Sequence, residues 1–438
     1  MARLQRKIDK YLVEWKNKKD KMPLIVKGAR QIGKTDAIEN FAKNNYKYIV
    51  EINFVLQKEY KTIFDNGYEV DTIISNISII NNNFKFVPGE TLIFFDEIQD
   101  CINVATSLKS FNIDRRFDVI CSGSMMGINY KEIESNSVGN KEDYIKYSMD
   151  FEEFLWANGI SEVVIDSLRK NIRGVTSVPA ALHKKMRQLL LQYTVVGGMP
   201  DVVQTFVDTK RLDEVLNMQR DIVRSYEDDM IKYANQKDKS HILECFQSIP
   251  KQLSKENKKF QYSVVKKGST ASKYAGSLQW IEDAEIISRC YNLSATELPL
   301  DGNAQDDVFK VYMRDCGLFI SMLEDGTQFD VLQGNLARYK GAIFENLIAD
   351  MFTKMGRKLY YFHKNSGLEV DFVIRYKGEC TLVEVKASSG NTKSTKTILA
   401  HPEKYHVNSA IKLGDYNVGR SGEILTLPLY MAFLLTEV

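Results

Sequence analysis

The sequence predicts an α/β fold whose first domain is built on a parallel sheet, over residues 24 to about 148. Continuous apolar runs, typical of strands buried on both faces, occur at residues 24–26 and 91–95, and residues 117–121 are predicted to form another buried strand. These runs alternate with amphipathic, helix-like segments, as in a parallel sheet covered by helices. A glycine-rich turn follows the first run and precedes a helical stretch, which indicates a strand, loop and helix in succession.

The glycine-rich turn is a candidate phosphate-binding loop, Gly28-Ala29-Arg30-Gln31-Ile32-Gly33-Lys34-Thr35. Its pattern, G-x-x-x-x-G-K-[ST], should arise by chance only about 0.01 to 0.02 times in a chain this long. Glycines at both ends let the backbone curl so that its N–H groups converge on a phosphate, and the next helix adds its positive dipole end. We expect Lys34 to reach the β- and γ-phosphates of ATP and Thr35 to ligate Mg²⁺.

Two acidic residues, Asp96 and Glu97, directly follow the buried run 91–95. The carboxyl ends of such strands are where open α/β sheets bind ligands. We expect Asp96 in the magnesium shell, through water, and Glu97 as the group that polarises the attacking water. A solvated acidic strand end is the alternative. Ser124, after the run 117–121, is placed to sense the γ-phosphate, although a plain turn would also explain it.

Composition limits the class of protein. A chain of 438 residues with 44% hydrophobic residues should form two to four domains, and a net charge of +2 neither favours nor excludes nucleic acid. Six widely spaced cysteines without a C-x-x-C pair predict neither disulfides nor a zinc site, and therefore a reducing cytoplasmic location. The charged amino terminus and the short apolar stretch at 424–435 predict no secretion and no membrane span.

The order of predicted elements suggests four domains. Residues 1–148 are expected to form the P-loop core with an N-terminal helix, 149–238 a helical lid, 239–330 a winged helix-turn-helix region, and 331–438 a final α/β domain. The winged helix is predicted from a helix, a lysine-rich loop, a second helix and a β-like stretch between 241 and 293. The loop and the start of the second helix contain seven lysines and only one acidic residue, Glu256. The lysines form a candidate phosphate-contacting surface: Lys251, Lys255, Lys258, Lys259, Lys266, Lys267 and Lys273. A solvated loop in a protein-interaction module is the alternative.

A second candidate centre lies near the carboxyl terminus. Strands are predicted at 368–376 and 380–388, and a tight hairpin at Lys377-Gly378 would place Asp371 opposite Glu384. Facing carboxylates repel unless a cation or a proton lies between them, which suggests a divalent metal. Glu345, from a helix at 341–353, could be a further ligand, and Lys386 could activate water in a metal-assisted phosphodiesterase. An ordinary ion pair between Glu369 and Lys386 on a solvated sheet face is the alternative.

Several segments resemble prokaryotic ATPases of the AAA superfamily that carry a C-terminal domain of uncertain function. The resemblance lies in residues 28–35, 94–99, 122–124, 150–156, 196–200, 340–346, 369–373 and 383–387. It implies an AAA-type ATPase core that uses ATP and Mg²⁺, a winged-helix middle, and a final domain similar to PD-(D/E)xK nucleases, which have a restriction-endonuclease-like fold. In that final domain Asp371 and Glu384 would bind Mg²⁺ or Mn²⁺, and Lys386 would be catalytic.

The resemblance leaves the arginine finger open. Asn140 stands where some relatives carry a basic residue, and the candidates are Arg30, Arg115, Arg116, Arg220 and Arg224. We therefore expect a cytoplasmic, magnesium-dependent ATPase whose nucleotide state controls a DNA-contacting winged helix and a metal-dependent nuclease-like domain. An ATP-gated switch that binds DNA or a protein partner without cleaving strands is the alternative, and a homo-oligomer is compatible with both.

Overall fold

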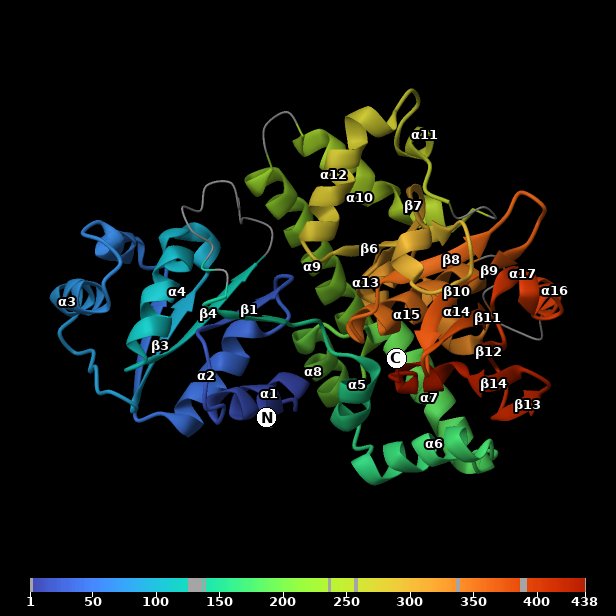
Figure 1. The fold of residues 1–438 in the computed structure, drawn as a ribbon, viewed down its shortest axis with the longest axis horizontal. Coiled ribbons are helices and arrows are strands. Elements are labelled where there is room, and N and C mark those ends of the chain that lie inside the picture. Colours follow the sequence, from blue (N-terminus) through green and yellow to red (C-terminus); the bar gives the residue numbers. More distant parts are fainter. Residues whose placement is uncertain are drawn as a thin grey trace. The chain divides into compact units, whose positions relative to one another are not determined.

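The computed structural model describes residues 3–124, 137, 139–234, 238–255, 259–335, 339–386 and 392–437. The chain divides into two compact units, an N-terminal unit, Met1–Ser148, and a C-terminal unit, Met149–Val438 (Figure 1). All six cysteines are buried and free. Among the described helices, none is long and apolar enough to cross a bilayer.

The N-terminal unit contains the predicted parallel sheet. Its strand order is β2-β3-β4-β1-β5, and every neighbouring pair runs parallel. The strands are β1 (Leu24–Gly28), β2 (Tyr48–Asn53), β3 (Thr91–Asp96), β4 (Asp118–Ser124) and β5 (Glu142–Ile145). The prediction of an α/β fold with a parallel sheet is confirmed here.

Both faces of this sheet are covered by helices, because successive strand residues point to opposite sides. Leu24, Val26 and Phe94 pack in a core with α1 and α2, whereas Ile25 and Phe95 pack with α3 and α4. The helices are α1 (Lys7–Lys16), α2 (Lys34–Asn45), α3 (Val70–Ile80) and α4 (Asn103–Asp114), with short 3-10 turns η1 (Lys58–Phe64) and η2 (Ile98–Asp100). This two-sided burial explains why the strands have continuous apolar runs.

The C-terminal unit begins with a helical region. Its helices are α5 (Phe151–Ala157), α6 (Glu162–Gly174), α7 (Ala180–Val196), α8 (Pro200–Thr209) and α9 (Leu212–Tyr233). Next come α10 (Lys239–Leu253), α11 (Tyr262–Val265), α12 (Ala271–Asp283) and an antiparallel strand pair, β6 (Ile287–Leu293) and β7 (Ala304–Met313), which flanks η5 (Leu300–Asn303). The buried residues of α12 are Tyr274, Ser277, Leu278 and Ile281.

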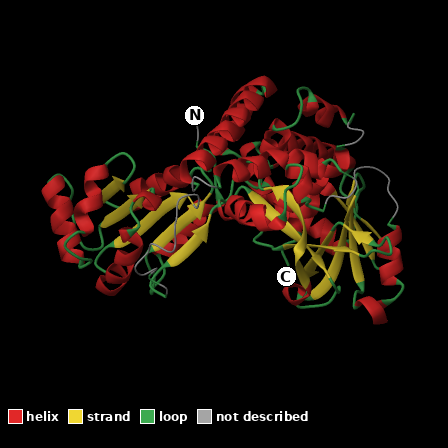
Figure 2. Ribbon diagram, turned by 90° about the horizontal axis from the view of Figure 1, so that it is seen from above, coloured by secondary structure: helices red, strands yellow, loops and turns green. Residues whose placement is uncertain are grey.

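Two sheets complete this unit, and Figure 2 shows their strands in yellow. One has the order β7-β6-β8-β9 and the other β10-β11-β12-β14-β13. The added strands are β8 (Leu359–His363), β9 (Glu369–Val370), β10 (Phe372–Tyr376), β11 (Glu379–Val385), β12 (Ser409–Gly414), β13 (Gly419–Ser421) and β14 (Ile424–Pro428). The remaining helices are α13 (Cys316–Ser321), α14 (Thr327–Gln333), α15 (Lys340–Lys354), α16 (Lys393–Leu399), α17 (Pro402–Tyr405) and η6 (Leu429–Leu434).

The first residue of the C-terminal unit is anchored by a buried polar cluster. The Met149 N–H donates to the Gly198 carbonyl at 2.6 Å. The Met149 carbonyl accepts from the Tyr193 hydroxyl at 2.9 Å and from the Lys354 ammonium at 3.2 Å. Lys354 also pairs with Asp350 at 3.0 Å. These bonds tie the start of the unit to α7 and α15.

We predict that Gly198→Ala destabilises the C-terminal unit by at least about 2 kcal/mol, because the new Cβ would lie 2.0 Å from the backbone oxygen of Met149. Gly276→Ala is the matched control, since nothing lies within 4 Å of its added Cβ on α12 and alanine favours helix by up to about 1 kcal/mol. Denaturant unfolding of both variants checks this. Equal stability of the two would contradict the packing described.

Candidate functional site

The phosphate-binding loop has the predicted position between β1 and α2. Gly28 ends the strand with φ of 149°, and Gly33 has φ of 76° directly before the helix. A Cβ on Gly28 would lie 2.2 Å from the backbone oxygen of Lys146. A side chain is therefore excluded at Gly28 both by backbone conformation and by the neighbouring strand.

The ammonium group of Lys34 is enclosed by the loop. It donates to the carbonyl oxygens of Gly28 at 3.1 Å and Ala29 at 2.7 Å, and only 8% of the residue is exposed. Burial lowers the pKa of Lys34 to about 8, although the carboxylates of Glu97 and Asp96 act in the opposite direction. A bound anion would favour the charged form of this lysine.

Asp96 joins the ends of three strands and the start of α2. Its carboxylate accepts hydrogen bonds from the Thr35 hydroxyl at 3.2 Å and the Asn53 amide at 2.9 Å, and from the Ser122 hydroxyl. Burial raises the pKa of Asp96, while the hydrogen bond from Ser122 lowers it. Adjacent hydroxyl and carboxylate oxygens are the hard ligands that Mg²⁺ prefers, so Thr35 and Asp96 fit the predicted ion.

Glu97 is linked to the end of β4 through Gln99. Its backbone has φ of 56°, and its carboxylate accepts from the Gln99 side chain. The Gln99 carbonyl oxygen in turn accepts from the Ser124 N–H at 3.2 Å. The Ser124 hydroxyl is buried and has no hydrogen-bond partner among the described residues. This unsatisfied group is compatible with the expected contact to a phosphate oxygen.

The C-terminal hairpin has the predicted register, with Tyr376 opposite Glu379. Lys377 and Gly378 form the turn with φ of 53° and 81°. The ladder stops at the pair Phe372 and Val383, one position before Asp371 and Glu384.

The predicted single strand at 368–376 is wrong, because it breaks at Asp371 into β9 and β10. There the Asp371 carboxylate accepts the N–H of Val385 at 2.8 Å. The Asp371 side chain thus accepts the hydrogen bond in place of a backbone carbonyl oxygen at the point where the pairing of β10 and β11 ends.

The alternative ion pair between Glu369 and Lys386 is also wrong. Glu369 lies on β9, which pairs with β8, and its carboxylate binds Lys310 at 3.1 Å. Lys386 instead pairs with Glu384 at 2.5 Å. The other Glu384 oxygen accepts from the Thr395 hydroxyl at 2.6 Å.

Glu345 reaches the same centre from α15. Its carboxylate accepts from the Tyr312 hydroxyl at 3.2 Å and lies 3.8 Å from the Lys310 ammonium. Burial, followed by the charge of Glu345, raises the pKa of Asp371 to about 7. Burial would lower the pKa of Lys310, but the charges of Glu345, Glu369 and Asp371 raise it above its usual value.

The predicted centre therefore assembles Glu345, Asp371, Glu384 and Lys386, and adds Lys310, which the sequence reasoning missed. Its carboxylate oxygens are engaged by lysines, two hydroxyls and a backbone N–H. Within the part of the chain that the structure describes, no group of three or more His, Cys, Asp or Glu side chains is arranged to hold a metal ion. Metal binding by Glu345, Asp371 and Glu384 stays a prediction, since it would require these contacts to rearrange.

Residues 20–155 match the family described as AAA domain. The chain carries an AAA domain. Two domains of unknown function match residues 187–328 (DUF8612) and 340–430 (DUF4143). No curated protein matches this sequence.

Several solved structures show weak similarity to about three quarters of this chain. A Walker-type ATPase of Pyrococcus abyssi is 12% identical, covering 73% of this chain and 95% of its own, with a TM-score of 0.43. The Aeropyrum pernix ORC1 protein in complex with DNA is 10% identical, covering 75% and 90%, with a TM-score of 0.28. Cdc6p from Pyrobaculum aerophilum is 9% identical, covering 77% and 96%, with a TM-score of 0.24. Similarity at this level assigns no function.

The lysine-rich surface outside the AAA domain is only partly described. Lys258 and Glu256 lie outside the described residues. Lys251, Lys266, Lys267 and Lys273 are exposed, and Lys266 pairs with Glu244 at 2.7 Å. The remaining lysines, Lys255 and Lys259, are partly exposed. DNA contact by this surface stays a prediction.

Among the arginine-finger candidates, Arg115, Arg116, Arg220 and Arg224 form ion pairs within the chain. Arg115 and Arg116 of the AAA domain pair with Asp20 at 3.6 Å and with Asp71 at 2.6 Å. Arg220 pairs with Asp325, and Arg224 with Asp221 at 3.3 Å. Arg30 lies in the loop and contributes to the lowered pKa of Lys34. No candidate is favoured over the others by these contacts.

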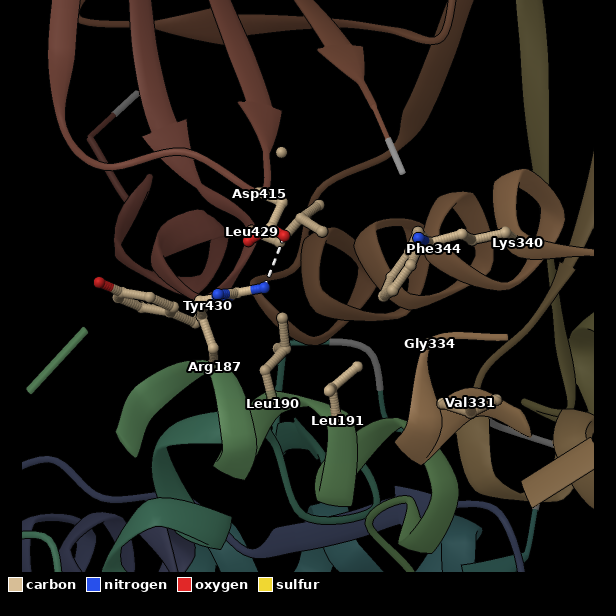
Figure 3. A pocket seen from close by; sticks show the side chains of 11 residues that line it. Arg187, Leu190, Leu191, Val331, Gly334, Lys340, Phe344, Asp415, Leu429 and Tyr430 are labelled. Carbon is tan, nitrogen blue, oxygen red and sulfur yellow. Dashed lines mark hydrogen bonds and ion pairs between the residues drawn. The ribbon is translucent and has the colours of Figure 1, made fainter. Parts of the chain in front are cut away.

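Two of the cavities formed by the described residues lie in the C-terminal unit. The one in Figure 3 has a volume of about 100 Å³ and is mainly apolar, with the ion pair of Arg187 and Asp415 at 2.5 Å beside it. Leu190 and Leu191 of α7 and Phe344 of α15 line it. The second is polar, has a volume of about 480 Å³, and includes Lys310 and Glu369 of the carboxylate centre in its wall.

Proposed function

We propose that this protein binds and hydrolyses ATP with Mg²⁺, and that the nucleotide state controls its C-terminal unit. The observation that carries the proposal is the arrangement around the loop. Lys34 is enclosed between the loop carbonyls, and Thr35 and Asp96 place two oxygen ligands 3.2 Å apart at the neighbouring strand end. Each group has the chemistry that a magnesium-bound triphosphate requires.

Different residues of the AAA domain would bind the phosphates, hold Mg²⁺ and activate water. Lys34 would bind the β- and γ-phosphates, and the loop N–H groups from Ala29 to Thr35 would face them. Thr35 and Asp96 would hold Mg²⁺, which supplies neutralisation of phosphate charge when bound. Glu97 would accept the proton of the attacking water, and the Ser124 hydroxyl would donate to a γ-phosphate oxygen.

We predict that Glu97→Gln lowers kcat for ATP hydrolysis at least about 100-fold, because glutamine cannot accept the proton. ATP affinity should change little, since Glu97 contributes no expected contact to the bound nucleotide. Phosphate release with Mg²⁺, measured with and without DNA, checks this. Glu90→Gln, at the opposite end of β3, is the control and should match the wild-type protein. Wild-type turnover in Glu97→Gln would contradict the assignment.

The nucleotide state is proposed to act on DNA binding by the region from α10 to β7. Three helices followed by an antiparallel strand pair agree with a winged helix-turn-helix, and its exposed lysines offer charge for phosphate contacts. A protein-docking role for the same lysines is the competing proposal. The two differ in salt dependence, because each phosphate contact to duplex DNA contributes about 0.9 to the slope of log K against log salt concentration.

A second candidate function is a metal-dependent nuclease centred on Asp371, Glu384 and Lys386. It is favoured by the proximity of the carboxylates of Glu345, Asp371 and Glu384. Burial, followed by the charge of Glu345, raises the pKa of Asp371 to about 7. The ion pairs made by Lys310 and Lys386 weigh against it, because they already neutralise much of the charge that would attract a metal ion. This balance favours the switch that binds DNA or a protein without strand cleavage.

We therefore predict that the protein binds plasmid and linear DNA in a nucleotide-dependent manner and yields no cleavage products with Mg²⁺ or Mn²⁺. The physical reason is that Lys386 already pairs with Glu384 at 2.5 Å, so a metal ion bound there would have to displace this contact. Gel analysis of the wild-type protein, Asp371→Ala and Lys386→Ala checks this. Cleavage by the wild-type protein that is lost in both variants would establish the nuclease instead, and cleavage undiminished in both would be assigned to a contaminant.

The same binding assay separates the two roles of the lysine-rich surface. Replacing Lys266, Lys267 and Lys273 by glutamine should weaken DNA binding and flatten its salt dependence. Lys184→Gln, an exposed change on α7, is the control. DNA binding that is insensitive to the triple change would support the protein-docking role.

A further inference from the structure

Two buried cations converge on one carbonyl oxygen of the phosphate-binding loop. The backbone oxygen of Ile32 accepts from the Arg6 guanidinium at 3.2 Å and from the Lys146 ammonium at 2.5 Å. Arg6 is 7% exposed and Lys146 is 3% exposed. Arg6 directly precedes α1 and Lys146 directly follows β5, so segments far before and far after the loop meet at its fifth residue.

The loop needs donors at this place for a geometric reason. A loop that turns its N–H groups toward an anion turns carbonyl oxygens toward the protein, where each needs a hydrogen-bond donor. The oxygens of Gly28 and Ala29 accept from Lys34. When Lys34 engages a phosphate it can leave these oxygens, whereas Arg6 and Lys146 approach the Ile32 oxygen from outside the loop. The Ile32 contacts can therefore persist in both nucleotide states.

The segment around Lys146 also contacts the first residue of the loop. The Lys146 backbone oxygen occupies the space that a Gly28 side chain would need. Arg6 extends the connection, since its second nitrogen donates to the Tyr147 carbonyl at 2.9 Å. Arg6 and residues 146 and 147 thus form one hydrogen-bonded support beside the loop. We call the part of it that binds the loop, namely Arg6, Lys146 and the Ile32 carbonyl, the Ile32 clamp.

We propose that Arg6 and Lys146 are positioning residues for ATP: by fixing the Ile32 carbonyl they keep the loop N–H groups directed at the phosphates. This inference rests on the proposed ATPase function. It assigns a role to the N-terminal segment before α1, which lies outside the region 20–155 that matches the AAA domain.

The test compares Arg6→Met and Lys146→Met with the wild-type protein in steady-state ATP hydrolysis and in thermal unfolding. Loss of one charge-assisted hydrogen bond in the nucleotide cradle should raise KM for ATP about tenfold in each variant. The value of kcat at saturating ATP should stay within about threefold, because neither residue touches the reacting atoms. A role limited to stability would lower Tm and leave KM of the folded protein unchanged.

Lys27→Met is the matched control, since Lys27 lies on β1 directly before Gly28 and its ammonium pairs with Asp143 at 2.8 Å. It removes a positive charge near the site without touching the clamp, and its KM should equal that of the wild-type protein. Equal increases of KM in Lys27→Met and Lys146→Met would overturn the clamp in favour of general electrostatic attraction.

Conservative variants cover the case in which the methionine variants do not fold. Lys146→Arg keeps a buried donor and should retain a near-wild-type KM, whereas Arg6→Lys can reach only one of the two carbonyl oxygens and should raise KM about threefold. A wild-type KM in Arg6→Lys and in every folded methionine variant would overturn the clamp alone. No ATP hydrolysis by the wild-type protein would instead overturn the proposed function.

Discussion

The constraint on which this site depends is the orientation of peptide groups in the loop between β1 and α2. Directing the N–H groups at a phosphate leaves carbonyl oxygens facing the protein, and these need donors. Lys34 serves Gly28 and Ala29, while Arg6 and Lys146 serve Ile32. The conformation of the eight-residue loop therefore depends on cationic side chains from three parts of the chain.

The parallel sheet supplies the second half of the site. Because all its strands run in one direction, the carboxyl ends of β2, β3 and β4 meet at one edge. Asn53, Asp96 and Ser122 consequently form one hydrogen-bonded group beside Thr35. Burial raises the pKa of Asp96, and a cation beside its carboxylate would favour the charged form. The fold and the chemistry of the site follow from the same arrangement of strands.

The sequence was sufficient to predict features that are determined by residues close together in the chain. The P-loop, the buried strands ending at Asp96 and the hairpin register of Tyr376 and Glu379 each follow from neighbouring residues. The partner of Glu369 could not be obtained in this way, because the break at Asp371 moves Glu369 into another sheet. Arg6, Lys146 and Lys310 were missed since their partners are distant in sequence. Lys310 did carry a signal, because it is the single charged residue in the otherwise apolar run 308–313, and such runs are typical of strands buried on both faces.

Calorimetric titration of the folded protein with ATP and Mg²⁺ tests the central claim most directly. We expect saturable heat with a dissociation constant in the micromolar range, about −8 kcal/mol of binding free energy. Lys34→Met should lose most of this heat, because it removes the ammonium group enclosed by the loop. The absence of binding heat by the wild-type protein at millimolar ATP, at several temperatures, would contradict the account.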